Sequence, residues 1–184
     1  MIKEYFFQHL FPNQYSKINR YMKENKSLVM ENEHLKRKID YCLDSVREAI
    51  ERGNEIIGIE TNKNDQLIVV SKSYIPDFTL DINLFGASLD ERNPPRIEGK
   101  PCINEIFNVN KLEIIDIKIF DNDVNKGNGS IAMEYFIKEA LKLKVEKITG
   151  ELSIQDLDHR DRAIHFYQKF NFNIKNNSLV YHLL

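Results

Sequence analysis

The feature that most constrains the fold is a change of pattern after residue 119, where a strand-like run gives way to a helix-like run across a glycine-rich turn. Residues 112–119 are rich in β-branched side chains and predict a mostly buried strand. After Gly129, apolar residues such as Ala132 and Phe136 recur at helical spacing and fall on one side of a helix. This order of strand, turn and helix predicts a mixed α/β chain.

The turn itself, residues 124–130 with the sequence VNKGNGS, has the composition of an anion-binding site. A turn that opens a helix leaves the first helical N–H groups unpaired, at the positive end of the helix dipole. Gly127 and Gly129 allow close backbone approach, and Lys126 adds a positive charge. A nucleotide-binding P-loop is excluded because no Gly-Lys-Ser/Thr follows, and Ala132 stands where a dinucleotide fingerprint has its third glycine. A purely structural turn is the alternative.

A second motif follows about forty residues later, at residues 160–172, with the sequence RDRAIHFYQKFNF. With both motifs in view, residues 108–184 resemble the GNAT superfamily of N-acetyltransferases. Its first signature, Arg/Gln-x-x-Gly-x-Gly/Ala, matches residues 124–129, although Val124 replaces the Arg or Gln. Its second signature matches at five positions, while Arg160 replaces an Asn and Asn171 replaces a Gly. Asn tolerates positive φ, so Asn171 suits the end of a helix.

The resemblance implies a fold, a cofactor and a reaction. The expected fold is α/β (α+β), with a mixed, mostly antiparallel sheet flanked by helices and preceded by a long N-terminal helix. The expected co-substrate is acetyl-CoA, whose thioester an amine attacks directly. Backbone N–H groups of one strand would stabilise the oxyanion, and those of the turn would hold the pyrophosphate. The cofactor-binding residues implied are Ile117, Lys118, Ile119, Asn125, Lys126, Gly127, Asn128, Gly129 and Ser130.

Two residues are candidates for proton transfer by the same resemblance. Tyr167 would protonate the leaving thiolate, and Glu113 would deprotonate the incoming ammonium. Each has a structural alternative: Tyr167 lies in an i, i+3, i+4, i+7 stripe typical of a helix that packs on a core, and Glu113 could be a solvated strand carboxylate. Asp116 and Glu151 are weaker candidates for the base.

The run of residues 156–162, DLDHRDR, contains carboxylates beside His159. No second histidine lies at a recognised ligand spacing except His165 on the following helix. A solvated loop and helix N-terminus, with Asp161 near the positive helix end, accounts better for this run than a metal site. We therefore expect no metal.

The N-terminal part predicts one long helix over residues 14–52, ended by Gly53. Its apolar residues alternate at spacings of three and four from Ile18 to Ala49, which is the pattern of a coiled-coil seam. Asn25 and Asn32 interrupt the seam as register-setting polar residues do. We expect a helical arm, residues 1–52, that forms a homodimer, and an acetyltransferase domain, residues 53–184. The alternative is a helix that packs on its own domain.

Between the helix and the glycine-rich turn, alternating residues predict strands at Glu55–Glu60, Gln66–Ser71 and Thr79–Phe85. Residues 62–65 predict a hairpin turn. Residues 93–96 and 99–101 contain prolines and a glycine and predict a loop. After the turn, residues 147–152 fit a further strand.

Composition excludes several classes of protein. The 184 residues carry 26 basic and 28 acidic side chains without a basic block, so no nucleic-acid partner is expected. Two cysteines exclude a disulfide framework, and no signal peptide or membrane span is visible, which makes the cytoplasm the expected compartment. The expected partner is a small-molecule or peptide amine. The alternative function is a non-catalytic module that senses CoA or binds a partner through the helical arm.

Overall fold

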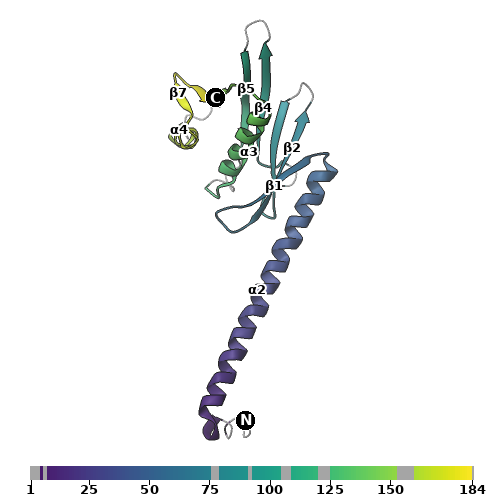
Figure 1. The fold of residues 1–184 in the computed structure, drawn as a ribbon, viewed down its shortest axis with the longest axis vertical. Helices are drawn as coiled ribbons and strands as arrows, with labels where there is room; N and C mark the ends of the chain where they lie inside the picture. The colour runs from purple at the N-terminus through teal and green to yellow at the C-terminus, as the bar shows by residue number, and fades with distance from the viewer. Residues whose placement is uncertain are drawn as a thin grey trace. The chain divides into compact units, whose positions relative to one another are not determined.

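The computed structural model describes residues 5, 8–75, 79–90, 93–104, 109–119, 125–152 and 160–183. These residues belong to two compact units, Met1–Tyr41 and Cys42–Leu184. Helix α2, Pro12–Glu51, is one continuous helix (Figure 1), and its residues belong in part to each unit. The predicted long helix is therefore confirmed, with its end marked by Gly53 at a φ of 77°. Glycine adopts this left-handed conformation without a Cβ penalty.

The second unit is built on one eight-stranded sheet in the order β1-β2-β3-β4-β5-β6-β8-β7. Neighbouring strands pair antiparallel except β5 and β6, which pair in parallel. The expected mixed, mostly antiparallel sheet is thus confirmed. Its strands are β1 (Glu55–Thr61), β2 (Leu67–Ile75), β3 (Thr79–Phe85), β4 (Arg96–Asn104), β5 (Val109–Lys118), β6 (Lys147–Glu151), β7 (Asn173–Lys175) and β8 (Ser178–His182).

Helix α3, Asn128–Lys142, covers one face of this sheet (Figure 1). Alternation along β3 places Leu80, Ile82 and Leu84 on the α3 face, where they are fully buried. Phe136 of α3 packs directly over Gly99 of β4, because a Cβ on Gly99 would lie 2.4 Å from its ring. This glycine therefore permits the close approach of helix and sheet.

A smaller apolar cluster involves the last turns of α2. Cys42 and Ala49 are buried together with Val69 and Phe85 of the sheet. Val69 and Phe85 alternate with α3-facing residues, so the cluster lies on the opposite face of the sheet. The end of α2 is consequently part of the sheet unit.

The loop predicted at residues 99–101 is wrong, because these residues lie inside β4. Pro101 pairs with Leu112 of β5, whereas the register of β4 with β3 ends at Gly99. The missing N–H of Pro101 therefore interrupts no ladder with β3. Pro101 and Gly99 resemble loop residues because the sequence alone does not show which edge of a strand is hydrogen-bonded to a neighbouring strand.

The predictions for β3, for the turn after β1 and for the end of α4 are confirmed. Strand β3 has the predicted bounds, and the turn at residues 62–65 closes through Asn62, whose Oδ1 accepts hydrogen bonds from the N–H groups of Asn64 and Gln66. Helix α4, Arg160–Lys169, is followed by Asn171 at a φ of 62°, as expected for an Asn in place of a helix-ending glycine.

Candidate functional site

A cavity of about 420 Å³ lies where the end of β5, the start of α3 and helix α4 meet. Both predicted motifs contribute to its wall: the glycine-rich turn on one side and the α4 motif on the other. The residues that line it are Lys63, Ile117, Ile119, Asn125, Gly127, Gly129, Ser130, Arg162, Ala163, His165, Phe166, Tyr167 and Lys169.

The glycine-rich turn has the backbone shape that its sequence predicts. Asn125 and Gly127 have positive φ values of 65° and 89°, and α3 begins at the next residue, Asn128. The carbonyl of Gly127 accepts hydrogen bonds from the N–H groups of Ser130 and Ile131, and no side chain caps the helix. The N–H groups of Asn128 and Gly129, in the first turn of α3, precede the helical ladder and are the groups that a helix start offers to an anion.

Lys63 reaches this cavity through contacts between segments that are distant in sequence. It lies in the turn between β1 and β2, and its N–H donates to the carbonyl of Lys126 at 2.9 Å. Beside it, the amide of Asn62 donates to the buried Oδ1 of Asn128 at 3.1 Å. These two bonds fix the β1–β2 turn against the start of α3.

The cavity wall is basic. Lys63, Arg162 and Lys169 are cationic, and the described residues that line the cavity include no Asp or Glu. Lys169 donates a hydrogen bond to the hydroxyl of Ser130 at 2.8 Å, which joins α4 to the first turn of α3. Positive side chains together with free helical N–H groups form an environment that favours a phosphate-bearing ligand.

Tyr167 lines the cavity from α4 and is 8% exposed. Its ring packs edge-to-face against Phe166 and Phe172, with ring centroids 5.4 Å apart in both pairs. The packing and catalytic interpretations of Tyr167 are therefore compatible: the ring belongs to the core, and the residue borders the cavity.

Several predicted site residues lie outside the cavity wall. Lys118 alternates with the lining residues Ile117 and Ile119, and its ammonium pairs with Glu98 and Asp116. The Asn128 side chain is buried against Asn62, and Lys126 contributes its carbonyl to Lys63. For Lys118 and Asn128 only the backbone remains a candidate for cofactor contacts.

Glu113 is also absent from the cavity wall. Its neighbours Leu112 and Ile114 face α3, so Glu113 lies on the other face, where the ammonium of Lys111 is 2.9 Å from its carboxylate. That hydrogen bond lowers the pKa of Glu113 below its usual range. The proposed base role stays a prediction, and a lowered pKa weakens a base.

Beside the cavity, the parallel strands β5 and β6 separate. Their ladder joins residues 111–113 to residues 147–149, and β5 continues to Lys118 without further pairing to β6 in the described part of the chain. A β-bulge at Ile115 shifts the β4–β5 register just before this region. Bulges commonly redirect strands next to active sites. In the described part of the chain, the backbone of β5 beside Ile117 therefore has no strand partner on the β6 side.

Sequence reasoning did not predict six lining residues as site residues: Lys63, Arg162, Ala163, His165, Phe166 and Lys169. The last five lie in the second motif, where spacing from Tyr167 on a helix could have identified them. Lys63 carries no sequence signal, because its position depends on the contact between Asn62 and Asn128.

The described residues contain no group of three or more His, Cys, Asp or Glu side chains arranged to hold a metal. Residues 153–159, including His159, lie outside the described residues. Among the helices that the structure describes, none is both long and apolar enough to cross a membrane.

No protein-family model matches the chain. The uncharacterized protein YocC of Bacillus subtilis (strain 168) is 29% identical over 136 residues, which are 73% of this chain and 76% of YocC. Among solved structures, NAA60 of Arabidopsis thaliana in complex with a bisubstrate analogue matches 56% of this chain and 75% of its own, with 12% identity and a TM-score of 0.46.

Two further structures match the same share of this chain. NAA60 in complex with acetyl-CoA covers 76% of its own chain at 12% identity, with a TM-score of 0.44. An acetyltransferase of the GNAT family from Streptococcus pneumoniae covers 65% of its own chain at 17% identity, with a TM-score of 0.42. With identities of 12–17% and TM-scores below 0.5, these matches assign neither a family nor a function to the chain.

Proposed function

We propose that this protein is an acetyl-CoA-dependent N-acetyltransferase of the GNAT type. In the proposed reaction the acceptor nitrogen bonds to the acetyl carbon as the carbon–sulfur bond breaks; the nitrogen loses a proton, and the sulfur gains one. The observation that carries the proposal is that the glycine-rich turn and Tyr167 border one basic cavity. The turn is suited to an anionic nucleotide, and Tyr167 supplies a hydroxyl proton.

The residues present fit the phosphates of CoA. Gly129 supports this fit, because a Cβ there would point toward Phe166 and Ile119, at 3.4 and 3.7 Å, into the cavity wall. The absence of that atom leaves the cavity open beside the first turn of α3. Backbone N–H groups of the turn would bind phosphate oxygens, and Lys63 and Lys169 would add charge-assisted contacts. When bound, acetyl-CoA supplies an activated thioester.

The chain's own groups would handle the two protons. Tyr167 would donate to the sulfur, and the backbone of Ile117, Lys118 and Ile119 would stabilise negative charge on the acetyl oxygen. Glu113 is retained as a candidate base, acting through water because it faces away from the cavity side. Holding the two reactants together would provide much of the remaining acceleration.

Calorimetry with CoA and acetyl-CoA tests the proposal first, followed by an acetyl-transfer assay over a panel of primary amines. Binding raises the free energy of unfolding by about 2.7 kcal/mol at a ligand concentration of 100 times Kd. We expect binding of both compounds and transfer to at least one amine. Absence of binding at millimolar concentration would refute the assignment.

A non-catalytic module is the second candidate. Arg160, which stands where the family signature has Asn, donates to Asn177 at 2.5 Å and is absent from the cavity wall. This departure favours a domain that keeps CoA binding for sensing or for partner recognition. It predicts CoA binding without transfer to any amine of the panel.

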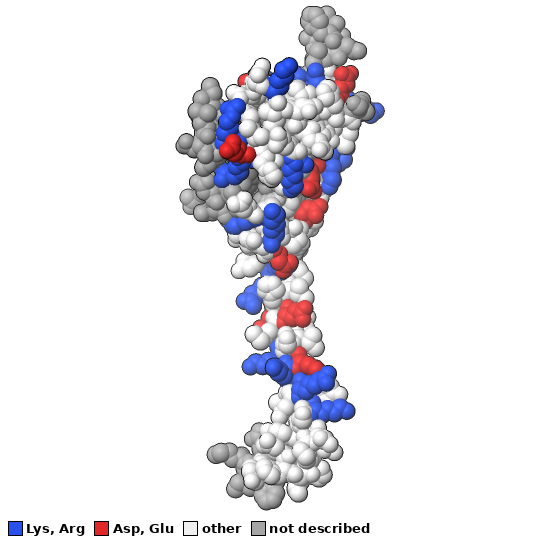
Figure 2. Space-filling view, turned by 90° about the vertical axis from the view of Figure 1, so that its left-hand side faces the viewer, with Lys and Arg blue, Asp and Glu red and all other residues white. Residues whose placement is uncertain are grey.

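We also propose that the protein forms a homodimer through the first part of α2. In this part of α2, large apolar side chains at the seam positions are exposed to solvent, including Leu28 (55% exposed) and Leu35 (45% exposed). Charged side chains flank uncharged surface along this helix (Figure 2). In a parallel pair, Glu31 of one copy would meet Lys36 of the other, which favours a second copy as the occupant of the seam.

A further inference from the structure

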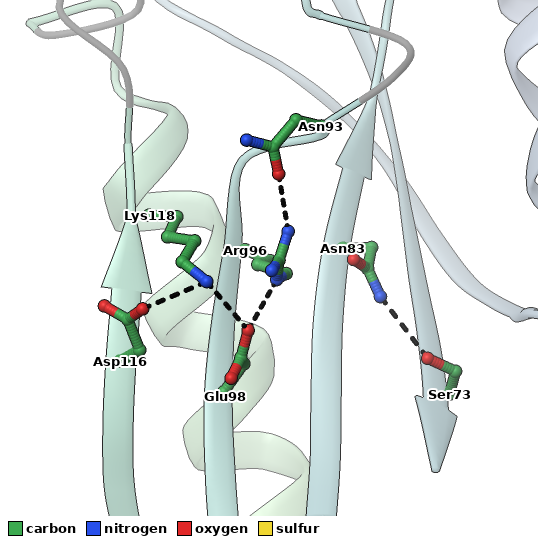
Figure 3. Close-up of polar contacts among 7 residues, drawn as sticks. All are labelled: Ser73, Asn83, Asn93, Arg96, Glu98, Asp116 and Lys118. Carbon is green, nitrogen blue, oxygen red and sulfur yellow. Dashed lines mark hydrogen bonds and ion pairs between the residues drawn. The ribbon is translucent and has the colours of Figure 1, made fainter. Parts of the chain in front are cut away.

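The sheet face opposite α3 carries a band of polar side chains at the level where β5 ends. We call the polar band the residues Ser73, Asp81, Asn83, Arg96, Glu98, Asp116 and Lys118, of which Figure 3 shows all but Asp81. Strand register places Ser73, Asp81, Glu98 and Asp116 in one row across four strands. Asn83, Arg96 and Lys118 form the adjacent row. Cross-strand neighbours of this kind lie about 5 Å apart.

Most charges in the polar band are paired. Glu98 accepts a hydrogen bond from Arg96 at 2.7 Å and lies 3.4 Å from the ammonium of Lys118. Lys118 also pairs with Asp116 at 3.2 Å, and Arg96 donates to Asn93 at 2.8 Å (Figure 3). Asn83 donates to Ser73 at 3.5 Å. The two cations are therefore engaged with two of the three carboxylates.

Asp81 is only partly satisfied: its carboxyl group shares a hydrogen bond with Asn83 and is attracted by Arg96 and Lys118, and these three contacts each lower its pKa. It is 6% exposed, and no donor among the described residues lies within hydrogen-bond distance of its Oδ1. Burial and the nearby charge of Glu98 raise the pKa of Asp81 to about 6. A buried carboxylate oxygen without a partner destabilises a fold, whereas an apolar side chain would suit this position. Such a group commonly marks a site for a ligand.

The polar band adjoins the cavity through β5. Asp116 and Lys118 alternate with Ile117, so the band and the Ile117 side of the cavity occupy opposite faces of one strand. The pairing of β5 with β6 has ended by this level, at Glu113. An acyl group held on the cavity side and a nucleophile held on the band side could therefore meet beside β5.

We propose that the polar band is the acceptor site and that Asp81 binds a second cationic nitrogen of the acceptor, remote from the nitrogen that is acetylated. This assignment deepens the proposed function and rests on it. The polar band holds the three carboxylates of Asp81, Glu98 and Asp116 and the two cations Arg96 and Lys118, so one further positive charge balances it. Asp81 lies two strands from Asp116, or about 10 Å, which makes Asp81 a binding residue and not the base. An aliphatic diamine has the required pair of nitrogens.

Binding of the acceptor is measured apart from acetyl transfer, so that this proposal and the proposed function can fail separately. The probes are diaminopropane, diaminobutane, diaminohexane and diaminooctane with terminal nitrogens, beside butylamine and hexylamine. Calorimetry of the full chain, with and without CoA, gives their affinities. We expect diamines to bind more tightly than monoamines of equal length, with an optimum among the diamines. A wild-type protein that prefers monoamines, or binds no diamine, overturns the proposal even when CoA binds.

The matched variants are Asp81→Asn, which keeps the shape and removes the charge, and Asp44→Asn, an exposed carboxylate of α2. Loss of one charged contact predicts a diamine affinity reduced about tenfold to a hundredfold in Asp81→Asn. Butylamine and CoA affinities should be unchanged, and Asp44→Asn should resemble wild type. An equal loss for diamine and monoamine, or no loss for either, contradicts a role for Asp81 in recognising a second cation. If CoA fails to bind while this diamine pattern holds, the acetyltransferase assignment falls and the polar band remains a diamine-binding site.

Discussion

The side-chain amide of Asn62 donates a 3.1 Å hydrogen bond to the buried Oδ1 of Asn128, a residue 66 positions later in the chain. The same Asn62 closes the β1–β2 turn, and the adjacent Lys63 borders the cavity. One side chain therefore sets both the turn and its distance from the first residue of α3.

Asn62→Ala removes these contacts and leaves the polar side chain of Asn128 without its partner. We expect a loss of about 1–3 kcal/mol in the free energy of unfolding and weaker CoA binding, because Lys63 loses its fixed position. Denaturant unfolding and calorimetry measure the two effects. Asn64→Ala, in the exposed part of the same turn, serves as the control. Unchanged CoA affinity in a destabilised Asn62→Ala variant would assign the contact to folding alone.

Gly129→Val tests the anion site with little strain. A Cβ at Gly129 meets its neighbours at ordinary contact distances, whereas Gly127 has a φ of 89° and would be strained by any side chain. We expect Gly129→Val to fold and to reduce CoA affinity at least about tenfold, because the side chain fills space beside the helical N–H groups. Gly53→Asn, at a glycine with open surroundings, is the control. Equal CoA affinity in both variants would mean that the turn is structural.

Tyr167→Phe keeps the packed ring and removes the hydroxyl. If the hydroxyl protonates the leaving sulfur, kcat should fall about 10²- to 10⁴-fold while CoA affinity changes little. Tyr181→Phe provides the comparison, since Tyr181 also packs on Phe172. A Tyr167→Phe enzyme with wild-type kcat over the whole pH range would leave Tyr167 as a core residue.

Asp81 predicts a particular pH dependence of stability. Its pKa is raised from 3.8 to about 6 in the folded protein, so the folded state holds the proton more tightly than the unfolded chain. Ionisation therefore destabilises the fold progressively from about pH 4 to pH 6, and the full penalty persists above that range. Asp81→Asn should raise the free energy of unfolding at pH 8 by on the order of 2–3 kcal/mol, and by less at pH 5. A variant that is equally or less stable than wild type at pH 8 contradicts this account.

Replacing Leu28 and Leu35 by Ser should convert the proposed dimer to a monomer. Both residues occupy the seam, and their large exposed surfaces need a partner helix. Met30→Ser is the control, because Met30 is 62% exposed but lies outside the seam. Light scattering of the full chain measures the oligomeric state. A wild-type protein that is monomeric at micromolar concentration refutes the dimer.

The sequence predicted those parts of the fold that depend on local pattern. Strand β3 and the long helix follow from periodicity, and the positive φ at Asn171 follows from the backbone tolerance of Asn. The error at Gly99 and Pro101 has a different origin. Whether a glycine faces a helix, or a proline faces an unpaired edge, depends on tertiary contacts that local composition does not encode.

The residues of the candidate site also fall into two groups: those that local sequence predicts and those that depend on tertiary contacts. The turn at Gly127 and the α4 motif around Tyr167 were recognisable because each is continuous in sequence. Lys63 enters the cavity from a hairpin, and Asp81 and Glu98 become neighbours only through strand register. Alternation within one strand predicts which residues share a face, but pairing between strands decides which of them meet.

The ladder between β5 and β6 has a consequence for how the protein folds and for which part of its sheet opens first. Strands β1–β5 form a meander of antiparallel neighbours, and β6–β8 form a second local group, whereas three parallel residue pairs join the two groups. Local pairings form early because they close short loops, and the parallel junction must await α3. This junction should therefore be the first part of the sheet to open, with the fastest amide hydrogen exchange among the paired strands. A ligand that contacts both β5 and α4 would stabilise this junction and slow its amide hydrogen exchange more than that of the meander.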